Sequence, residues 1–374
     1  MHTVINDEFY MKLAIELAER VIGQTGINPA VGCVIVNDGQ IVGMGAHLRR
    51  GEGHAEVHAL QMAGSRAEGG TAYVTLEPCS HFGKTPPCSL RLMEAGVKRV
   101  VVACTDPNPV VAGSGLTLLR QQAIEVKVGV LALEAYRIIE KFAKYITTGL
   151  PYVTLKTAQT LDGKIATHEG HSQWITNEQA REVVHTLRHR HQAIMVGIGT
   201  VLQDDPSLTT RLSVQGLNPI RMIVDSKLRL PLSAKVVSDK SAQTWVLTTI
   251  TADQDRAAAL ERNGVTVIRI NEGDRVDVRK AIEACGQREI SSILLEGGGH
   301  LNGSMLEAGL IDQVVLMIAP KIVGHKDAPG SFIFPGPAKM SDAYCLEQIS
   351  VETLGDNVII SGLPVRQEQE GREE

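Results

Sequence analysis

The N-terminal part of the chain alternates between helical and strand-like spacing of apolar residues. Apolar side chains recur every three or four positions over residues 8–22, which predicts an amphipathic helix. Two apolar runs flank Asn37-Asp38-Gly39, and this turn chemistry predicts a β-hairpin. The full set predicted here comprises helices at 8–22, 54–63 and 131–146 and strands at 31–36, 41–46, 72–76, 97–103 and 124–128. Interleaving of this kind predicts an α/β layer whose later strands are mostly parallel.

A second alternation of strands and helices follows residues 147–151. Gly149 then Pro151 is typical of a helix end followed by an extended segment, so we expect a hinge there. The strands predicted beyond it are 152–156, 193–197, 221–225, 244–248, 265–270, 293–296 and 313–318. The chain is therefore expected to form an α/β domain over 1–147, a second over 148–374, and a frayed charged tail over 366–374.

Composition narrows the class of protein. A length of 374 residues suits two domains, and the 43% hydrophobic content is that of a globular protein. A net charge of −5, with dispersed Lys and Arg, argues against nucleic-acid binding. We find no signal peptide and no long apolar run, so we expect a cytoplasmic protein without a membrane partner.

The cysteines are too scattered for a disulfide framework. Two of the six stand out, since His54-Ala55-Glu56 is followed by Pro78-Cys79 and then by Cys88. One imidazole and two thiolates make a three-ligand zinc set that leaves a position open for water. Glu56 is placed to carry protons for that water. This combination is typical of zinc deaminases that act on nucleobase-like amines.

The spacing departs from the usual P-C-x-x-C, because eight residues separate Cys79 from Cys88. We expect His54 and Glu56 at the start of one helix and Cys79 at the start of another, where helix amides favour a thiolate. The other four thiols, Cys33, Cys104, Cys285 and Cys345, are expected to be buried or idle.

Other interpretations of this pattern stay open at this point. His54 and His58 could simply share a helix face, and a zincin is excluded because Ala55 stands where that motif needs Glu. A zinc-stabilised binding module would need a fourth ligand, which His58 or His81 could supply. A nucleoside or tRNA deaminase fused to an unrelated domain is the alternative enzyme.

Glycines after two apolar strands indicate a phosphate-bearing cofactor in the second half. Gly197-Ile198-Gly199-Thr200 and Gly297-Gly298-Gly299 each follow a predicted strand, where backbone amides can approach an anion. Each signal alone is weak, since glycine after a strand usually marks only a turn. Neither segment matches G-x-G-x-x-G, so the Rossmann fingerprint is absent.

The motifs together resemble one family. The segments 28–32 (NPAVG), 54–58 (HAEVH) and 78–88 (PCSHFGKTPPC) resemble the deaminase part of the RibD family, the bifunctional deaminase–reductases of riboflavin biosynthesis. The segments 156–164 (KTAQTLDGK), 172–176 (SQWIT), 204–209 (DDPSLT) and 296–298 (EGG) resemble its reductase part. The resemblance implies a cytidine-deaminase-like domain followed by a dihydrofolate-reductase-like domain that uses NADPH.

It also implies the reactions and partners. The first domain would deaminate 2,5-diamino-6-(5-phosphoribosylamino)pyrimidin-4(3H)-one with zinc. The second would reduce the ribosyl group of 5-amino-6-(5-phosphoribosylamino)uracil to ribityl. The partners would be these phosphorylated pyrimidines and further copies of the chain, in a dimer or tetramer.

Site residues follow from the resemblance and from side-chain chemistry. In the first domain we expect Asn28 to contact a base edge, Lys84 a phosphate, and His47 the same pocket. The cofactor residues implied by the family are Gln159, Trp174, Thr200, Asp204, Ser226, Gly298, Gly299, His300, Leu301, Asn302 and Gly303. The substrate residues implied in the second domain are Ser172, Arg188, Leu208, Arg211 and Glu296. Arg188 and Arg211 suit a phosphate clamp.

Overall fold

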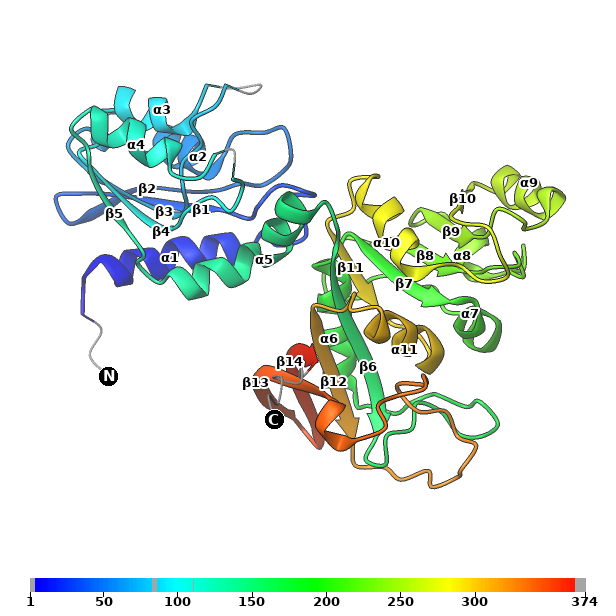
Figure 1. Ribbon diagram of the computed structural model, residues 1–374. Coiled ribbons are helices and arrows are strands. Elements are labelled where there is room, and N and C mark those ends of the chain that lie inside the picture. Colours follow the sequence, from blue (N-terminus) through cyan, green and yellow to red (C-terminus); the bar gives the residue numbers. More distant parts are fainter. Residues whose placement is uncertain (1–3, 83–85, 110, 367–374) are drawn as a thin grey trace, which may run out of the picture. The chain divides into compact units, whose positions relative to one another are not determined.

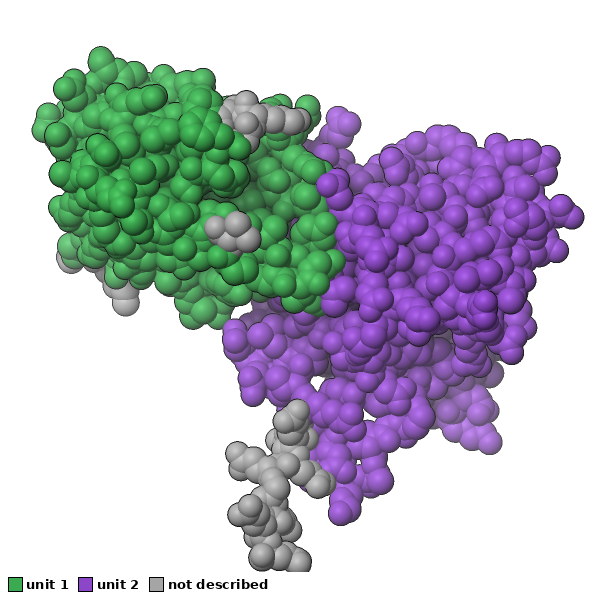
Figure 2. All heavy atoms as spheres, turned by 45° about the horizontal axis from the view of Figure 1, so that its top comes forward, with its two compact units in different colours: residues 1–149 green, residues 150–374 purple. Residues whose placement is uncertain are grey.

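The protein is described by a computed structural model that covers residues 4–82, 86–109 and 111–366. Its internal contacts divide the chain into two compact units, residues 1–149 and 150–374, which Figure 2 colours separately. Each unit has its own sheet and its own hydrophobic core. Among the helices of the described ranges, we find none with the length and apolar character needed to cross a membrane.

The first unit is a three-layer α/β/α arrangement around a five-stranded sheet of order β2-β1-β3-β4-β5. Its strands are β1 (Gly32–Asn37), β2 (Gln40–Ala46), β3 (Thr71–Leu76), β4 (Arg99–Cys104) and β5 (Glu125–Val128). Its helices are α1 (Asp7–Glu19), α2 (Ala55–Ala63), α3 (Cys88–Glu94), α4 (Ser114–Gln121) and α5 (Ala132–Thr148), with a 3-10 turn η1 (Gly64–Ala67). Helices α1 and α5 cover one face, and α2, α3 and α4 cover the other (Figure 1).

Strand direction follows the prediction. β1 pairs antiparallel with β2 and β3, whereas β3, β4 and β5 are parallel. Helix α2 lies unusually close to β2, because a Cβ on Gly45 would stand 2.4 Å from the carbonyl oxygen of Ala55. Glycine at this position therefore lets the start of α2, with His54 and Glu56, lie directly on the sheet.

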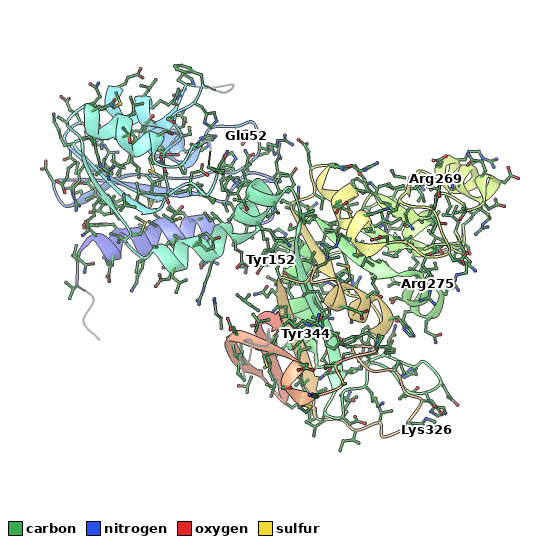
Figure 3. All side chains as sticks on the ribbon, in the orientation of Figure 1. Glu52, Tyr152, Arg269, Arg275, Lys326 and Tyr344 are labelled. Carbon is green, nitrogen blue, oxygen red and sulfur yellow. The ribbon has the colours of Figure 1, made fainter. Side chains whose placement is uncertain are left out.

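The second unit is built on a nine-stranded sheet of order β10-β9-β8-β7-β11-β6-β12-β14-β13. Its strands are β6 (Tyr152–Thr160), β7 (Ala193–Gly197), β8 (Ile220–Val224), β9 (Thr244–Thr248), β10 (Val265–Arg269), β11 (Ser292–Leu295), β12 (Gln313–Ala319), β13 (Tyr344–Leu354) and β14 (Asn357–Arg366). The strands from β10 to β12 are parallel, and β14 and β13 add an antiparallel hairpin. Figure 3 labels Tyr152 and Tyr344, which begin β6 and β13.

Helices pack on both faces of this sheet. They are α6 (Glu178–His189), α7 (Ile198–Asp204), α8 (Lys235–Ser238), α9 (Gln254–Arg262), α10 (Val278–Gly286) and α11 (Gly299–Glu307), with a 3-10 turn η2 (Met340–Asp342). Alternate residues of β7 show the two faces. Met195 packs in the cluster that includes α10 and α11, whereas Ile194 and Val196 pack with α7 and α9.

The hairpin β13–β14 is the main element that the apolar pattern did not predict. Most of β13 is exposed, so its residues do not alternate clearly between apolar and polar. Its tip contacts the start of α6: the Asn177 side chain donates to the Leu354 carbonyl (2.7 Å) and to Asp356 (2.8 Å). The Asn177 amide donates to the side chain of Asn357 (2.8 Å).

Candidate active sites

His54, Cys79 and Cys88 bring their ligand atoms together, all within 4.8 Å of one another. His54 Nδ1 lies 3.6 Å from Cys79 Sγ and 3.3 Å from Cys88 Sγ. Sulfur and nitrogen ligands of a tetrahedral zinc ion stand about 3.5 Å apart, given Zn–S near 2.3 Å and Zn–N near 2.0 Å. The donor set and its spacing therefore fit zinc.

The local structure corrects one expectation. His54 is the N-cap of α2, as predicted, but Cys79 lies in a loop and does not begin a helix. Cys88 begins α3 instead, directly after Pro87, a residue favoured at helix starts. The Cys88 amide donates to Cys79 Sγ at 3.3 Å, so the helix start still supports the Cys79 thiolate. Hydrogen bonding from Cys88, together with His54, holds the pKa of the Cys79 thiol well below its usual range.

Glu56 is the second residue of α2 and lines the same cavity as His54 and Cys79, a space of about 240 Å³. Its side chain is buried, and burial raises its pKa to about 7 although His54 opposes this. A carboxyl group that exchanges a proton near neutral pH suits acid–base work.

The cluster has three protein members within the described residues. His58 and His81 do not join it, although His81 lines the cavity. The fourth tetrahedral position is thus left for water, which favours a catalytic over a structural zinc site.

Asn28 and His47 line this cavity together. His47 Nδ1 lies 3.2 Å from the Gly53 carbonyl, which can only accept, so this nitrogen carries the proton. Burial lowers the pKa of His47, and its other nitrogen accepts from Asn28 Nδ2 at 3.2 Å. The amide of Asn28 is thereby oriented. Lys84 lies outside the described residues.

Sequence reasoning missed one wall of this cavity. Asp106, Asn108 and Val111 line it, and they follow the carboxyl end of β4. Phe142 and Ile146 of α5 also contribute. Polar residues directly after a buried parallel strand were the available signal, since ligands bind at the carboxyl ends of such strands.

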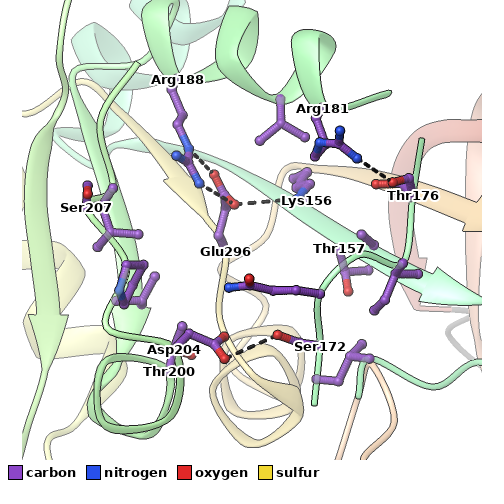
Figure 4. Close-up of a pocket in the computed structure, with 18 of the residues that line it drawn as sticks. Lys156, Thr157, Ser172, Thr176, Arg181, Arg188, Thr200, Asp204, Ser207 and Glu296 are labelled. Carbon is purple, nitrogen blue, oxygen red and sulfur yellow. Dashed lines mark hydrogen bonds and ion pairs between the residues drawn. The ribbon is translucent and has the colours of Figure 1, made fainter. Parts of the chain in front are cut away.

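The second unit holds a larger cavity, of about 510 Å³, beside the carboxyl ends of β7 and β11 (Figure 4). All five residues expected to meet the substrate line it, as do four of those expected to meet the cofactor. These nine are Ser172, Arg188, Leu208, Arg211, Glu296, Trp174, Thr200, Asp204 and Gly298. An open cavity at this end of a parallel sheet, with both cationic side chains and glycine backbone in its wall, fits a phosphate-bearing dinucleotide such as NADPH.

A buried charge cluster forms one side of this cavity. Arg188 and Lys156 both point at Glu296, as Figure 4 shows. Burial would raise the pKa of Glu296, but Arg188 and Lys156 outweigh it and lower the pKa to about 2. Burial, helped by Arg188 and Arg211, lowers the pKa of the neighbouring His185 to about 4. The sequence analysis identified Arg188 as a site residue but assigned no role to Lys156 or His185.

Two further contacts shape the wall. The Arg181 guanidinium stacks over the Trp174 ring at 4.7 Å and donates to the Thr176 carbonyl at 2.9 Å. Ser172 donates to Asp204 at 3.2 Å, and burial raises the pKa of this carboxyl group. Arg181 had no assigned role, yet it shares a face of α6 with His185 and Arg188 at helical spacing.

The other expected cofactor residues lie outside this wall. Gln159 accepts from Ser331 at 2.5 Å, and Ser226 accepts from the Val276 amide at 3.0 Å. Asn302 is fully buried and donates to the Ser331 carbonyl. The remainder, Gly299, His300, Leu301 and Gly303, belong to the first turns of α11. Their contact with a cofactor stays a prediction.

Both units of the chain are similar to known proteins. Residues 4–104 match the cytidine and deoxycytidylate deaminase zinc-binding region, and residues 151–360 match the RibD C-terminal domain. Riboflavin biosynthesis protein RibD of Bacillus amyloliquefaciens is 45% identical, over 96% of each chain. That of Escherichia coli strain K12 is 43% identical, over 95% of this chain and 99% of the relative.

Solved structures match over both units. Form 1 of Acinetobacter baumannii RibD has a TM-score of 0.86 at 38% identity, over 96% of this chain and 99% of that one. A Thermotoga maritima diaminohydroxyphosphoribosylaminopyrimidine deaminase/5-amino-6-(5-phosphoribosylamino)uracil reductase has a TM-score of 0.84 at 36% identity, with the same coverage. The predicted order of a deaminase-like fold and a reductase fold is confirmed.

Proposed function

Because this chain belongs to the RibD family of bifunctional riboflavin-biosynthesis deaminases and reductases, we propose that its two cavities carry out the two reactions in order. Residues 1–147 would deaminate 2,5-diamino-6-(5-phosphoribosylamino)pyrimidin-4(3H)-one. Residues 148–374 would reduce the ribosyl group of 5-amino-6-(5-phosphoribosylamino)uracil. The juxtaposition of His54, Cys79 and Cys88 with the buried Glu56 in one cavity carries the first assignment.

In the first cavity, His54, Cys79 and Cys88 would hold zinc. A zinc ion with these ligands lowers the pKa of water so that a nucleophile is available near neutral pH. Glu56 is placed to pass one proton from the water to the ring nitrogen and a second proton from the added hydroxyl to the departing amine. The oriented Asn28 amide presents hydrogen-bonding groups that match a pyrimidine edge. Lys84 would contact the phosphate.

In the second cavity, Trp174, Thr200, Asp204 and the backbone at Gly298 would hold NADPH. When bound, NADPH supplies the hydride for reduction of the ribosyl carbon. Arg188 donates two hydrogen bonds to Glu296. The pair therefore presents a rigid polar surface to the cavity, and the guanidinium is not a free cation for the phosphate. Arg211 lines the same cavity and would meet the ribose phosphate, together with Ser172 and Leu208.

A coupled assay tests both halves in one experiment. Purified protein with zinc is given the diaminopyrimidinone ribosylamine phosphate and NADPH, and ammonia release and NADPH oxidation are followed together. Wild type is expected to release ammonia first and oxidise NADPH after a lag. Glu56→Ala is expected to do neither until the deaminated intermediate is supplied, when NADPH oxidation returns to the wild-type rate. Ammonia release without NADPH oxidation would overturn the reductase assignment.

A cytoplasmic location and a homo-oligomer, dimer or tetramer, complete the proposal. The scattered cysteines support the location, and the family resemblance supports the oligomer. Light scattering coupled to size-exclusion chromatography measures the mass of the assembly directly, and a monomer at micromolar concentration would contradict the proposal.

A further inference from the structure

We infer that Glu77 is a positioning residue of the deaminase cavity. Its carboxylate holds residues 106–109 and 111–116 against the segment that carries Cys79. Asp106, Asn108 and Val111 of this stretch form one wall of the cavity. The inference rests on the proposed deamination in this cavity and adds a residue that acts without donating or accepting the reaction's protons.

The carboxylate of Glu77 accepts hydrogen bonds from backbone amides at both ends of this stretch. Oε2 accepts from Asp106 at 3.2 Å and from Gly113 at 2.9 Å. Oε1 accepts from Gly115 at 2.9 Å and from Leu116 at 3.4 Å. One side chain thus joins the start of the wall to the first turn of α4.

Burial makes this arrangement costly to disturb. The Glu77 residue is only 4% exposed, and a buried carboxylate needs hydrogen-bond donors in place of water. The four amides supply them, and the positive end of the α4 dipole adds to the compensation. The same amides would lack acceptors if the carboxylate were removed, because they lie at a helix start and in a loop.

The start of α4 also packs closely against the segment that carries Cys79. A Cβ on Gly115 would lie 2.0 Å from the carbonyl oxygen of Pro78, the residue between Glu77 and Cys79. Glycine at position 115 therefore allows α4 to approach the ligand segment closely enough for the Glu77 bonds. The Glu77 amide also donates to the Cys104 carbonyl at 3.0 Å, which fixes it to the end of β4.

The wall held in this way faces the substrate. Asp106, Asn108 and Val111 line the same cavity as Asn28 and His47. A wall that samples other arrangements lowers the fraction of enzyme ready to bind, and the apparent affinity falls by that fraction. Loss of Glu77 should therefore raise KM for the pyrimidine while leaving the zinc and Glu56 in place.

Steady-state deaminase kinetics of Glu77→Gln test this, with Asp7→Asn as the matched control. Asp7 is also a poorly exposed carboxylate of the first unit, held by Arg99 and Lys127 at 2.7 Å each, but it does not line the cavity. Both changes replace a carboxylate by an amide and should destabilise this unit. We expect KM to rise about tenfold for Glu77→Gln, the order expected when buried donors lose an acceptor, with kcat within about twofold. Asp7→Asn should leave KM unchanged.

Two readouts separate positioning from general damage. Zinc content should equal that of wild type, and hydrogen exchange should accelerate in a peptide covering residues 111–118 but not in one covering α2. Gly115→Ala disturbs the same wall independently, because the added methyl group pushes α4 away from Pro78 while the Glu77 carboxylate stays. It should raise KM in the same way. This variant decides the inference if Glu77→Gln does not fold.

Three results would overturn the inference. One is an equal KM in Glu77→Gln and Asp7→Asn; another is loss of zinc in proportion to loss of activity, which would place the effect on Cys79. The third is unchanged exchange in residues 111–118. Absence of ammonia release from wild type would instead overturn the proposed function, so the two failures are distinguishable.

Discussion

Arg188 and Glu296 form a two-pronged ion pair in the wall of the reductase cavity. Arg188 Nε lies 2.8 Å from Oε1 of Glu296 and Nη2 lies 3.1 Å from Oε2. Both side chains are only about a tenth exposed, and Lys156 Nζ stands 3.5 Å from Oε2. Planar pairing of this kind fixes the orientation of both groups, which a lysine in place of Arg188 would not reproduce.

Arg188→Met should therefore damage both stability and reduction. It leaves the Glu296 carboxylate buried with Lys156 as its remaining cation, and we expect a loss of about 3 kcal/mol in the unfolding free energy of the second unit. NADPH oxidation should fall sharply, while ammonia release stays at the wild-type rate. Urea unfolding and the coupled assay measure the two effects. Adding Glu296→Gln should restore stability without restoring reduction; an unstable double variant would contradict this reasoning.

The same pair predicts a dependence of stability on pH. The pKa of Glu296 is lowered from 4.5 to about 2 in the folded protein, so the folded state binds fewer protons than the unfolded state at acid pH. This stabilisation is complete above pH 4.5 and is lost as the pH falls through about 2. Unfolding free energies of wild type and Glu296→Gln should converge as the pH falls from about 5 to about 2. A constant difference would show that the carboxylate charge does not contribute.

Removal of one proposed zinc ligand should separate the two activities. Cys88→Ser is expected to lose zinc and to lower deaminase kcat/KM by more than the 10- to 100-fold that outer-sphere changes cost. Reduction of the supplied intermediate should be unaffected. Cys104→Ser is the matched control, because its thiol donates to the Thr75 carbonyl at 3.2 Å and is not a ligand. Zinc analysis by mass spectrometry checks the cause, and zinc retained at wild-type level in Cys88→Ser would refute it.

Arg181 should affect the cofactor through Trp174. Trp174 is 60% exposed, and the stacked guanidinium restricts its ring. Arg181→Met should weaken NADPH binding by roughly two- to fivefold, the value of an exposed cation–π contact. Because the chain has only two tryptophans, fluorescence quenching in a Trp245→Phe background reports on Trp174 alone. Identical NADPH titrations with and without Arg181 would rule out the contact.

Asn177 links the β13–β14 hairpin to the helix that carries Arg181, His185 and Arg188. Its side chain caps α6 by accepting from the Ala180 amide at 2.9 Å. Asn177→Ala should cost about 1–2 kcal/mol and also raise KM in the reductase reaction, since a shifted α6 moves the cavity wall. Asp253→Ala removes the equivalent cap of α9, where Asp253 accepts from Arg256 at 2.7 Å. Asp253→Ala should lose stability without a change in KM. Equal KM values for Asn177→Ala and Asp253→Ala would argue against a link between the hairpin and the cavity.

Periodicity predicted most of the fold because the central strands of both sheets are buried on two faces. Strands β7 and β9 coincide with predicted segments, β3 differs from its segment by one residue at one end, and β1 and β11 are each shifted by one residue. The hairpin β13–β14 was missed because an exposed edge carries no apolar alternation. The helix expected at Cys79 was wrong because the proline before Cys88 sets the helix start.

The sequence by itself determined the two-domain order and the candidate zinc ligands, since ligand chemistry and the spacing of His54, Glu56 and Cys79 are properties of residue type and local order. Only the tertiary structure decided which distant groups meet. Lys156, Arg188 and Glu296 come from β6, α6 and the end of β11, and Glu77 meets amides some 30 to 40 positions further along the chain. Such contacts depend on strand order and helix placement, and these are set by packing of the whole unit.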